Sequence, residues 1–213
     1  NHALGMVLFD AGKVSEAIAP LEKALQINPG FTAARRSLAS VLSAAGRADE
    51  AVGLLKTMLG ESPMDRGALL QLSFIHIEKK QFAQAAEAIG PYLAQHAEDA
   101  DFLNNMGLAL RGLHQSEEAY KVLRRASRLR EDDPMILTNL GQVLVDLGRP
   151  AEARPLHEKA LSAMPADAHI LANYGACLVA LGDKDKARET LDAALAADPN
   201  HADALAARVK LGA

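Results

Sequence analysis

Three asparagines recur at a fixed interval of 34 residues, namely Asn105, Asn139 and Asn173. Counting back by the same interval leads to Gln71 and Ser37, so five successive positions carry a side chain that donates and accepts hydrogen bonds. A primary amide can pair with both the N–H and the C=O of an extended polypeptide backbone without reading the side chains of that polypeptide. The spacing therefore predicts a row of hydrogen-bonding groups, carried by one structural element that repeats along the chain.

The other side chains that could do chemistry do not form a recognisable motif. The seven histidines lack the i,i+4 pairing and the Cys–His spacing of a metal site. The single cysteine, Cys177, cannot form an internal disulfide and follows Val143 at the same 34-residue interval, so we expect a core thiol rather than a nucleophile. The glycines form no phosphate-binding loop. The sequence thus predicts no catalytic residue, no cofactor and no metal.

The composition favours an all-α fold. The 213 residues include 42 alanines and 32 leucines, the strongest helix formers, whereas aromatic residues make up only 4%. Sheets are built mainly from β-branched and aromatic residues, and these are sparse in this chain. A β-sandwich, a β-barrel and a parallel-sheet enzyme are therefore disfavoured.

Charge and hydropathy narrow the range of partners. A net charge of −4 leaves no excess of Lys and Arg with which to bind nucleic acid. Every apolar stretch is broken well before the roughly 18 residues of a membrane span, so we expect no membrane insertion. Because the first residue is Asn1 rather than Met, the sequence leaves open whether a signal peptide has been removed. The compartment is undecided between the cytoplasm, which we favour, and the periplasm.

The 34-residue interval extends over nearly the whole chain. If Thr32 is position 1 of a repeat, leucine dominates repeat positions 7, 11 and 24, a small residue fills position 8, and glycine fills position 15 in four of six units. Repeat position 20 holds alanine in every unit, at Ala17, Ala51, Ala85, Ala119, Ala153 and Ala187. A period of this length is typical of a protein built from stacked repeats.

Each repeat has the pattern of two helices joined by a turn. Repeat positions 4, 7, 8 and 11 have the spacing of one helical face, and positions 20, 24 and 27 give a second. Glycine at position 15 suits the left-handed residue that follows a helix, and proline at position 32 ends the second helix. Small residues at positions 8 and 20 allow close helix packing. One such hairpin cannot bury both of its apolar faces, so we expect the hairpins to stack.

The pattern L-G-x2-[Y/L], then A-x3-[F/L], then P on a 34-residue period resembles the tetratricopeptide repeat (TPR) family. The resemblance covers nearly the whole chain and implies a right-handed α-solenoid of helix–turn–helix units. We expect six units, at residues 1–31, 32–65, 66–99, 100–133, 134–167 and 168–201, with the first lacking its opening three positions. Residues 202–213 are expected to form a capping helix or the start of a seventh unit.

In this family the first helix of each unit lines a concave groove, and the resemblance places repeat positions 2, 5, 6, 9, 12 and 13 there. The expected groove residues are Asn105, Asn139, Asn173, Gln71, Asn104, Arg36, Arg111, Thr138, Gln142, His169 and Phe74. The amide row is similar to the asparagine ladder in the TPR region of O-linked N-acetylglucosamine transferases, which implies binding of peptide backbones. The alternative is that these amides form hydrogen bonds between repeats.

A run of cations, Lys121, Arg124, Arg125, Arg128 and Arg130, falls in an expected second helix. Second helices face outward in the family, and acidic residues follow the run directly. We therefore interpret the run as a solvated outer face, with a docking patch as the alternative.

The sequence as a whole predicts a non-catalytic interaction scaffold that binds a peptide or partner protein in its groove. The alternative is the substrate-recruiting arm of a larger enzyme, such as a glycosyltransferase or sulfotransferase. A start within a helix and the apolar Val209 and Leu211 in the tail would suit such a fragment. Self-association through the terminal helices is a third hypothesis, because one chain's terminal helix could cap another chain.

Overall fold

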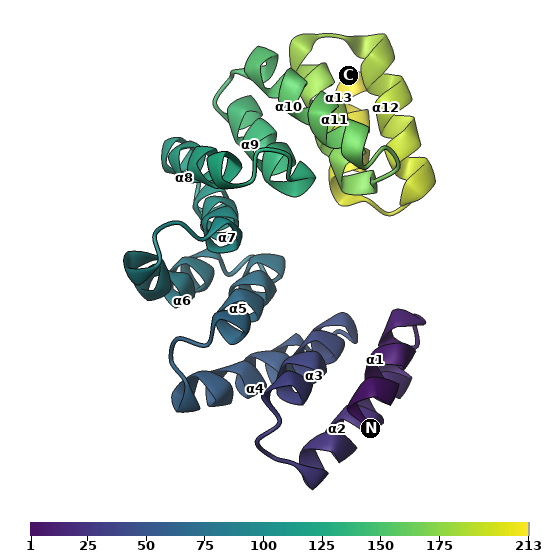
Figure 1. Cartoon of the computed structure of the whole chain (residues 1–213). Helices are drawn as coiled ribbons and strands as arrows, with labels where there is room; N and C mark the ends of the chain where they lie inside the picture. The colour runs from purple at the N-terminus through teal and green to yellow at the C-terminus, as the bar shows by residue number, and fades with distance from the viewer. Residues whose placement is uncertain (213) are drawn as a thin grey trace. The chain divides into compact units, whose positions relative to one another are not determined.

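The computed structural model of the protein describes residues 1–212, which form thirteen α-helices and no strand (Figure 1). The all-α prediction is confirmed. The helices are α1 (His2–Asp10), α2 (Val14–Ile27), α3 (Thr32–Ala44), α4 (Ala48–Glu61), α5 (Arg66–Glu78), α6 (Phe82–Gln95), α7 (Ala100–Gly112), α8 (Ser116–Leu129), α9 (Pro134–Asp146), α10 (Pro150–Ala163), α11 (Ala168–Leu181), α12 (Lys184–Ala197) and α13 (Ala202–Gly212). No helix among the described residues is both long enough and apolar enough to cross a bilayer.

The helices pack in consecutive pairs within two compact units, Asn1–Gln95 and His96–Ala213. In the first unit, the odd-numbered helices α1, α3 and α5 contact one another in order, and each also contacts the helix that follows it. In the second unit, α7, α9, α11 and α13 make the same succession, and α8, α10 and α12 pack on their preceding helices. Each unit is therefore a stack of helical hairpins with its first helices side by side.

The two helices of a pair meet where a small residue at repeat position 8 lies under a large side chain from repeat position 24. A Cβ atom added to Gly107 would lie only 2.4 Å from Cγ of Leu123. Gly5 with Leu21, Gly141 with His157 and Gly175 with Leu191 make the same contact, which we call the helix-crossing contact. The alanines at repeat position 20 are all 0% exposed. Small residues thus occur where helices approach closely, as the spacing predicts.

Aspartate caps four of the first helices, at Asp65, Asp99, Asp133 and Asp167. Each carboxylate accepts hydrogen bonds from backbone N–H groups of the first turn, for example from the Ala68 amide at 2.8 Å. A helix start leaves such N–H groups without a helical partner, and a capping carboxylate satisfies them. These residues also recur at 34-residue spacing, so this signal was present in the sequence but was not recognised.

The turn after the first helix is left-handed at repeat position 15 in all six hairpins. Four of these positions are glycines, with φ between 72° and 78°. The other two are Lys80, with φ of 57°, and His114, with φ of 61°. The glycine prediction is confirmed at four positions, and the turn geometry persists at two where a side chain makes that backbone unfavourable.

Replacing His114 by glycine is expected to stabilise the protein by about 0.5–1 kcal/mol. The substitution removes a left-handed strain of about 1–2 kcal/mol, partly offset by the greater freedom of glycine in the unfolded chain. The free energy of unfolding in urea measures the change. Gly148→Ala, at the same repeat position, is the control and should destabilise by about 1 kcal/mol. A His114→Gly protein less stable than the wild type would contradict this account of the turn.

Candidate functional site

The predicted groove residues lie in both compact units, and we describe each group within its own unit. Arg36 on α3 and Gln71 and Phe74 on α5 belong to the first unit. The other residues belong to the second unit and lie on its first helices: Asn104, Asn105 and Arg111 on α7, Thr138, Asn139 and Gln142 on α9, and His169 and Asn173 on α11.

In the first unit, the amide of Gln71 connects two neighbouring first helices. Its Nε2 donates to the backbone oxygen of Arg36 at 3.2 Å and to the hydroxyl of Ser40. The guanidinium of Arg36 lies 3.7 Å from the Asp65 carboxylate. Phe74 is 53% exposed, which is high for an aromatic side chain. This face therefore combines a hydrogen bond between repeats with an exposed aromatic ring.

The three asparagines in the second unit are nearly buried. Asn105, Asn139 and Asn173 are 9%, 5% and 6% exposed. Buried amides require hydrogen-bond partners, because a desolvated amide without one is costly. The regular spacing thus produces a row of largely buried amides. The hydrogen-bond partners of each amide determine which of its polar atoms stay available to a ligand.

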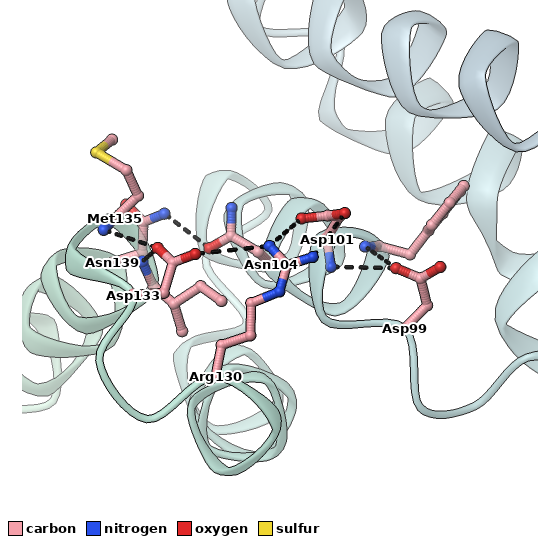
Figure 2. A network of polar contacts seen from close by, with 9 residues as sticks. Asp99, Asp101, Asn104, Arg130, Asp133, Met135 and Asn139 are labelled. Atoms are coloured by element: carbon pink, nitrogen blue, oxygen red, sulfur yellow. Dashed lines mark hydrogen bonds and ion pairs between the residues drawn. The ribbon is translucent and has the colours of Figure 1, made fainter.

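Asn139 forms a hydrogen bond to the neighbouring repeat. Its Nδ2 donates to Oδ1 of Asn104 at 2.9 Å, which joins α9 to α7 (Figure 2). This bond uses one of the two amide hydrogens of Asn139 and one lone pair of Asn104. The amino group of Asn104, which is half-buried, is not used in this bond, and neither is the carbonyl oxygen of Asn139. The pair therefore keeps a donor and an acceptor next to each other.

Asn173 instead forms hydrogen bonds within its own helix. Its Nδ2 lies 2.8 Å from the backbone oxygen of His169 and 3.2 Å from Nε2 of the same residue. Burial lowers the pKa of His169, with a further lowering from His201. A neutral imidazole can accept from the Asn173 amide, which fits this arrangement.

The prediction that Thr138 lines an open face is wrong. Thr138 is 0% exposed, and its hydroxyl donates to the backbone oxygen of Pro134 at 2.7 Å. A threonine hydroxyl in a helix often bonds back to the carbonyl four residues earlier, which turns it away from solvent. The side chain at repeat position 5 is consequently accessible at Asn104 on α7, whereas at Thr138 on α9 it is buried.

An ion pair also links α7 to α9. The Arg111 guanidinium donates to one oxygen of Asp146, and Gln142 donates to the other oxygen at 3.4 Å. Asp146 was missed by the sequence reasoning, although it stands 35 residues after Arg111 and four after Gln142. Because Asp146 neutralises Arg111, these helices present little net charge at this end.

Arg130 has a structural role that the sequence reasoning did not foresee. It follows α8, and its guanidinium binds both oxygens of Asp101 at 2.7 and 3.0 Å and lies 3.6 Å from Asp133 (Figure 2). The hydrogen bond to Asp101 is the main reason that its pKa is raised. The residue is exposed, as a solvated face requires, and it also ties the α8–α9 loop to the start of α7.

The buried titratable groups do not form a reactive site. Cys177 is 0% exposed and donates to the backbone oxygen of Pro150, and burial raises its pKa to about 11, so the thiolate is suppressed. His157 is 0% exposed, and neither ring nitrogen has a hydrogen-bond partner. Burial, with a smaller effect of His169, lowers the pKa of His157 to about 4. The described residues contain no cluster that could hold a metal ion.

His157 is expected to make the fold sensitive to acid. Its pKa rises from about 4 in the folded protein to 6.5 in the unfolded chain, so between these values the unfolded state binds more protons. The resulting stability is present above pH 6.5 and is lost as the pH falls toward 4, by an amount on the order of 3 kcal/mol. The free energy of unfolding, measured in urea from pH 7.5 to 4, shows this decline.

A His157→Leu variant tests this assignment. Leucine fits opposite glycine in the Gly107–Leu123 and Gly175–Leu191 contacts, so the replacement should pack without strain. It removes two unsatisfied buried nitrogens and should stabilise the protein by about 1–3 kcal/mol at neutral pH. Its stability should also depend less on pH. Because the other histidines are unchanged, equal pH dependence in the two proteins would rule out His157 as the cause.

Comparison with known proteins agrees with this architecture. A family model described as tetratricopeptide repeat matches residues 8–66, 42–106 and 144–211, and a second model with the same description matches residues 98–166. No curated protein sequence matches the chain.

Solved structures show the same fold at low sequence identity. A tetratricopeptide repeat protein from Parabacteroides merdae is 16% identical, with a TM-score of 0.82 over 100% of this chain and 83% of that one. TTC0263, a TPR protein of Thermus thermophilus, is 24% identical, with a TM-score of 0.69 over 84% of this chain and 95% of that one. YrrB, described as a TPR protein with an unusual peptide-binding site, is 24% identical, with a TM-score of 0.57 over 89% and 97% of the two chains.

These structural similarities concern the fold alone, whereas the family models match the sequence over more than half of its length. Together with the 34-residue period and the stacked helical hairpins, these matches show that the chain belongs to the tetratricopeptide repeat family.

Proposed function

We propose that the protein is a non-catalytic interaction scaffold that holds an extended segment of a peptide or partner protein against α7, α9 and α11. The observation that carries this proposal is the amide pair Asn139–Asn104, which connects two adjacent first helices at 2.9 Å. TPR proteins are interaction scaffolds as a class, and in this chain we assign ligand recognition to the surface around the amide pair.

The amide pair has the groups that an extended backbone needs. Such a backbone presents N–H and C=O groups alternately along its edges. The amino group of Asn104 can donate to a ligand carbonyl, and Oδ1 of Asn139 has a lone pair available for a ligand N–H. Because both proposed contacts are to the backbone, this part of the site would be tolerant of ligand sequence.

Apolar side chains on the same three helices would supply the selectivity. Met135 on α9 is 38% exposed, and Leu108, Val145 and Val179 are half-buried. Burying this surface beneath apolar ligand side chains would be favourable at about 25 cal/mol per Å². The Arg111–Asp146 ion pair adds little net charge. The ligand we propose is therefore an uncharged, partly apolar extended segment.

Two structural relatives support binding by this fold. YrrB is described as having an unusual peptide-binding site. Cut9 is described in a complex with Hcn1, and one of these chains matches 99% of the present chain at 19% identity, with a TM-score of 0.81 over 42% of its own length. The further similarity to the asparagine ladder of glycosyltransferase TPR regions stays a prediction, since Asn173 bonds within its own helix.

In the first unit, Phe74 and Gln71 are a second proposed contact surface.

Asn104→Asp is expected to weaken peptide binding about fivefold while leaving the fold intact. The carboxylate keeps an oxygen that accepts from Asn139, but it loses the amino group that we assign to the ligand. Loss of one such hydrogen bond costs about 1 kcal/mol, which corresponds to the stated change in Kd. Peptides selected on the wild-type protein from a random library, and measured by isothermal titration calorimetry, provide the test.

The control is Gln84→Ala, which removes an exposed amide from the second helix α6 and should not change the affinity. Replacing single ligand amides by esters gives a second readout, since one ester that deletes an N–H should weaken binding to the wild type. Selected peptides that bind Asn104→Asp and the wild type equally, with no sensitive ester position, would refute backbone recognition by this pair.

A further inference from the structure

The outward face of α8 has an unusual concentration of positive charge. Lys121, Arg124, Arg125 and Arg128 are all exposed. Their spacing of i, i+3, i+4 and i+7 places them on one side of the helix, because an α-helix has 3.6 residues per turn. At about 1.5 Å per residue, the four charges occupy roughly 10 Å of helix. We call these four residues the basic stripe.

Among the described residues, the arginines of the basic stripe differ from most other arginines in lacking carboxylate partners. Elsewhere, carboxylates lie within ion-pair distance of Arg35, Arg36, Arg47, Arg111, Arg130, Arg149, Arg154 and Arg208. Within residues 1–212, no carboxylate pairs with Lys121, Arg124 or Arg128. Arg188 on α12 is also unpaired, but it stands alone. The stripe is thus the place where unpaired arginines cluster.

One member of the stripe is already held in position. A terminal nitrogen of Arg125 donates to the backbone oxygen of Ala97 at 2.7 Å, which fixes the guanidinium while leaving its other N–H groups for a ligand. An arginine held in this way loses less side-chain entropy when it binds. Like charges on neighbouring helical turns repel one another, so an added anion would relieve repulsion as well as form ion pairs.

Acidic residues limit the stripe at both ends. Glu117 and Glu118 are exposed in the first turn of α8, and Glu131 and Asp132 are exposed just after its end. A long polyanion following the helix would meet these carboxylates after about two turns. The chain as a whole carries a net charge of −4, which also disfavours nucleic acid and a flat anionic membrane. A short anionic ligand matches the length of the stripe.

We propose that the basic stripe of α8 is a docking surface for a short acidic segment of a partner protein. Arginine binds carboxylates through paired hydrogen bonds, so Arg124, Arg125 and Arg128 could each engage an Asp or Glu side chain. Leu129, which is 43% exposed and follows Arg128 directly, offers an apolar contact to a peptide that contains a hydrophobic residue. This surface lies on a second helix and does not depend on the proposed binding to the first helices.

The test uses a fluorescein-labelled heptapeptide with six glutamates around one leucine, titrated with the full chain in about 50 mM NaCl. Fluorescence anisotropy gives the affinity. The triple variant K121Q/R124Q/R128Q should bind at least tenfold more weakly than the wild type, and binding to the wild type should weaken as salt rises. The control variant K184Q/R188Q/K210Q removes the same number of exposed cations elsewhere and should bind within about twofold of the wild type.

A second measurement locates the peptide without any variant. In the wild-type protein, peptide addition should shift the backbone amide NMR signals of α8 more than those of α10 and α12. The proposal is overturned if the wild type does not bind the peptide at about 1 mM protein, or if both triple variants weaken binding equally. It is also overturned if duplex DNA or phosphatidylserine vesicles bind the basic stripe more tightly than the peptide does. Groove variants such as Asn104→Asp should leave this binding unchanged.

Discussion

The helix-crossing contact is the interaction on which the rest of the structure depends. In the fourth repeat, Leu123 is 0% exposed because Gly107 has no side chain to hold the helices apart. Complete burial of one leucine is worth about 1.5–3 kcal/mol, and the contact recurs in successive hairpins. Since each hairpin touches only its neighbours, stability accumulates from these local contacts and from stacking between adjacent hairpins, rather than from one central core. The same contact fixes which side of α1, α7, α9 and α11 faces the second helix of its pair.

That orientation determines which polar residues can meet a ligand. Repeat position 6 directly precedes the core position 7, so its side chain lies at the edge of the contact between adjacent first helices. An amide at such an edge must find a partner inside the protein, and Asn139 finds Asn104 whereas Asn173 finds His169. The amides at repeat position 6 therefore all have a structural role. Which partner each amide selects decides whether it still has a donor or acceptor free for a ligand. The amides of Asn104 and Asn139 can thus both join adjacent helices and offer groups to a ligand.

The sequence predicts the periodic features of this protein well because periodicity follows from helix packing. The alanines at repeat position 20 are buried, and the glycine turns are left-handed, as expected. The sequence does not predict the features that depend on which neighbour a side chain selects. Thr138 closes onto Pro134, Arg111 pairs with Asp146, and Arg130 reaches Asp101, and each outcome depends on rotamers and helix crossing rather than on spacing. The capping aspartates were periodic and could have been found.

The amide pair lies on first helices and the basic stripe lies on a second helix. This arrangement limits how binding at one surface can influence the other. Asn104 is on α7 and the basic stripe is on α8, so the two surfaces are connected by the packing of that pair around Gly107 and Leu123, by the Arg130–Asp101 ion pair and by α9, which contacts both helices. Substitutions of exposed residues on either helix leave the Gly107–Leu123 contact in place. A ligand on one helix can therefore affect the other only by shifting these contacts, and close packing at the α7–α8 crossing resists such a shift. A repeat protein can in this way carry two independent recognition surfaces on one hairpin, because its core lies between them.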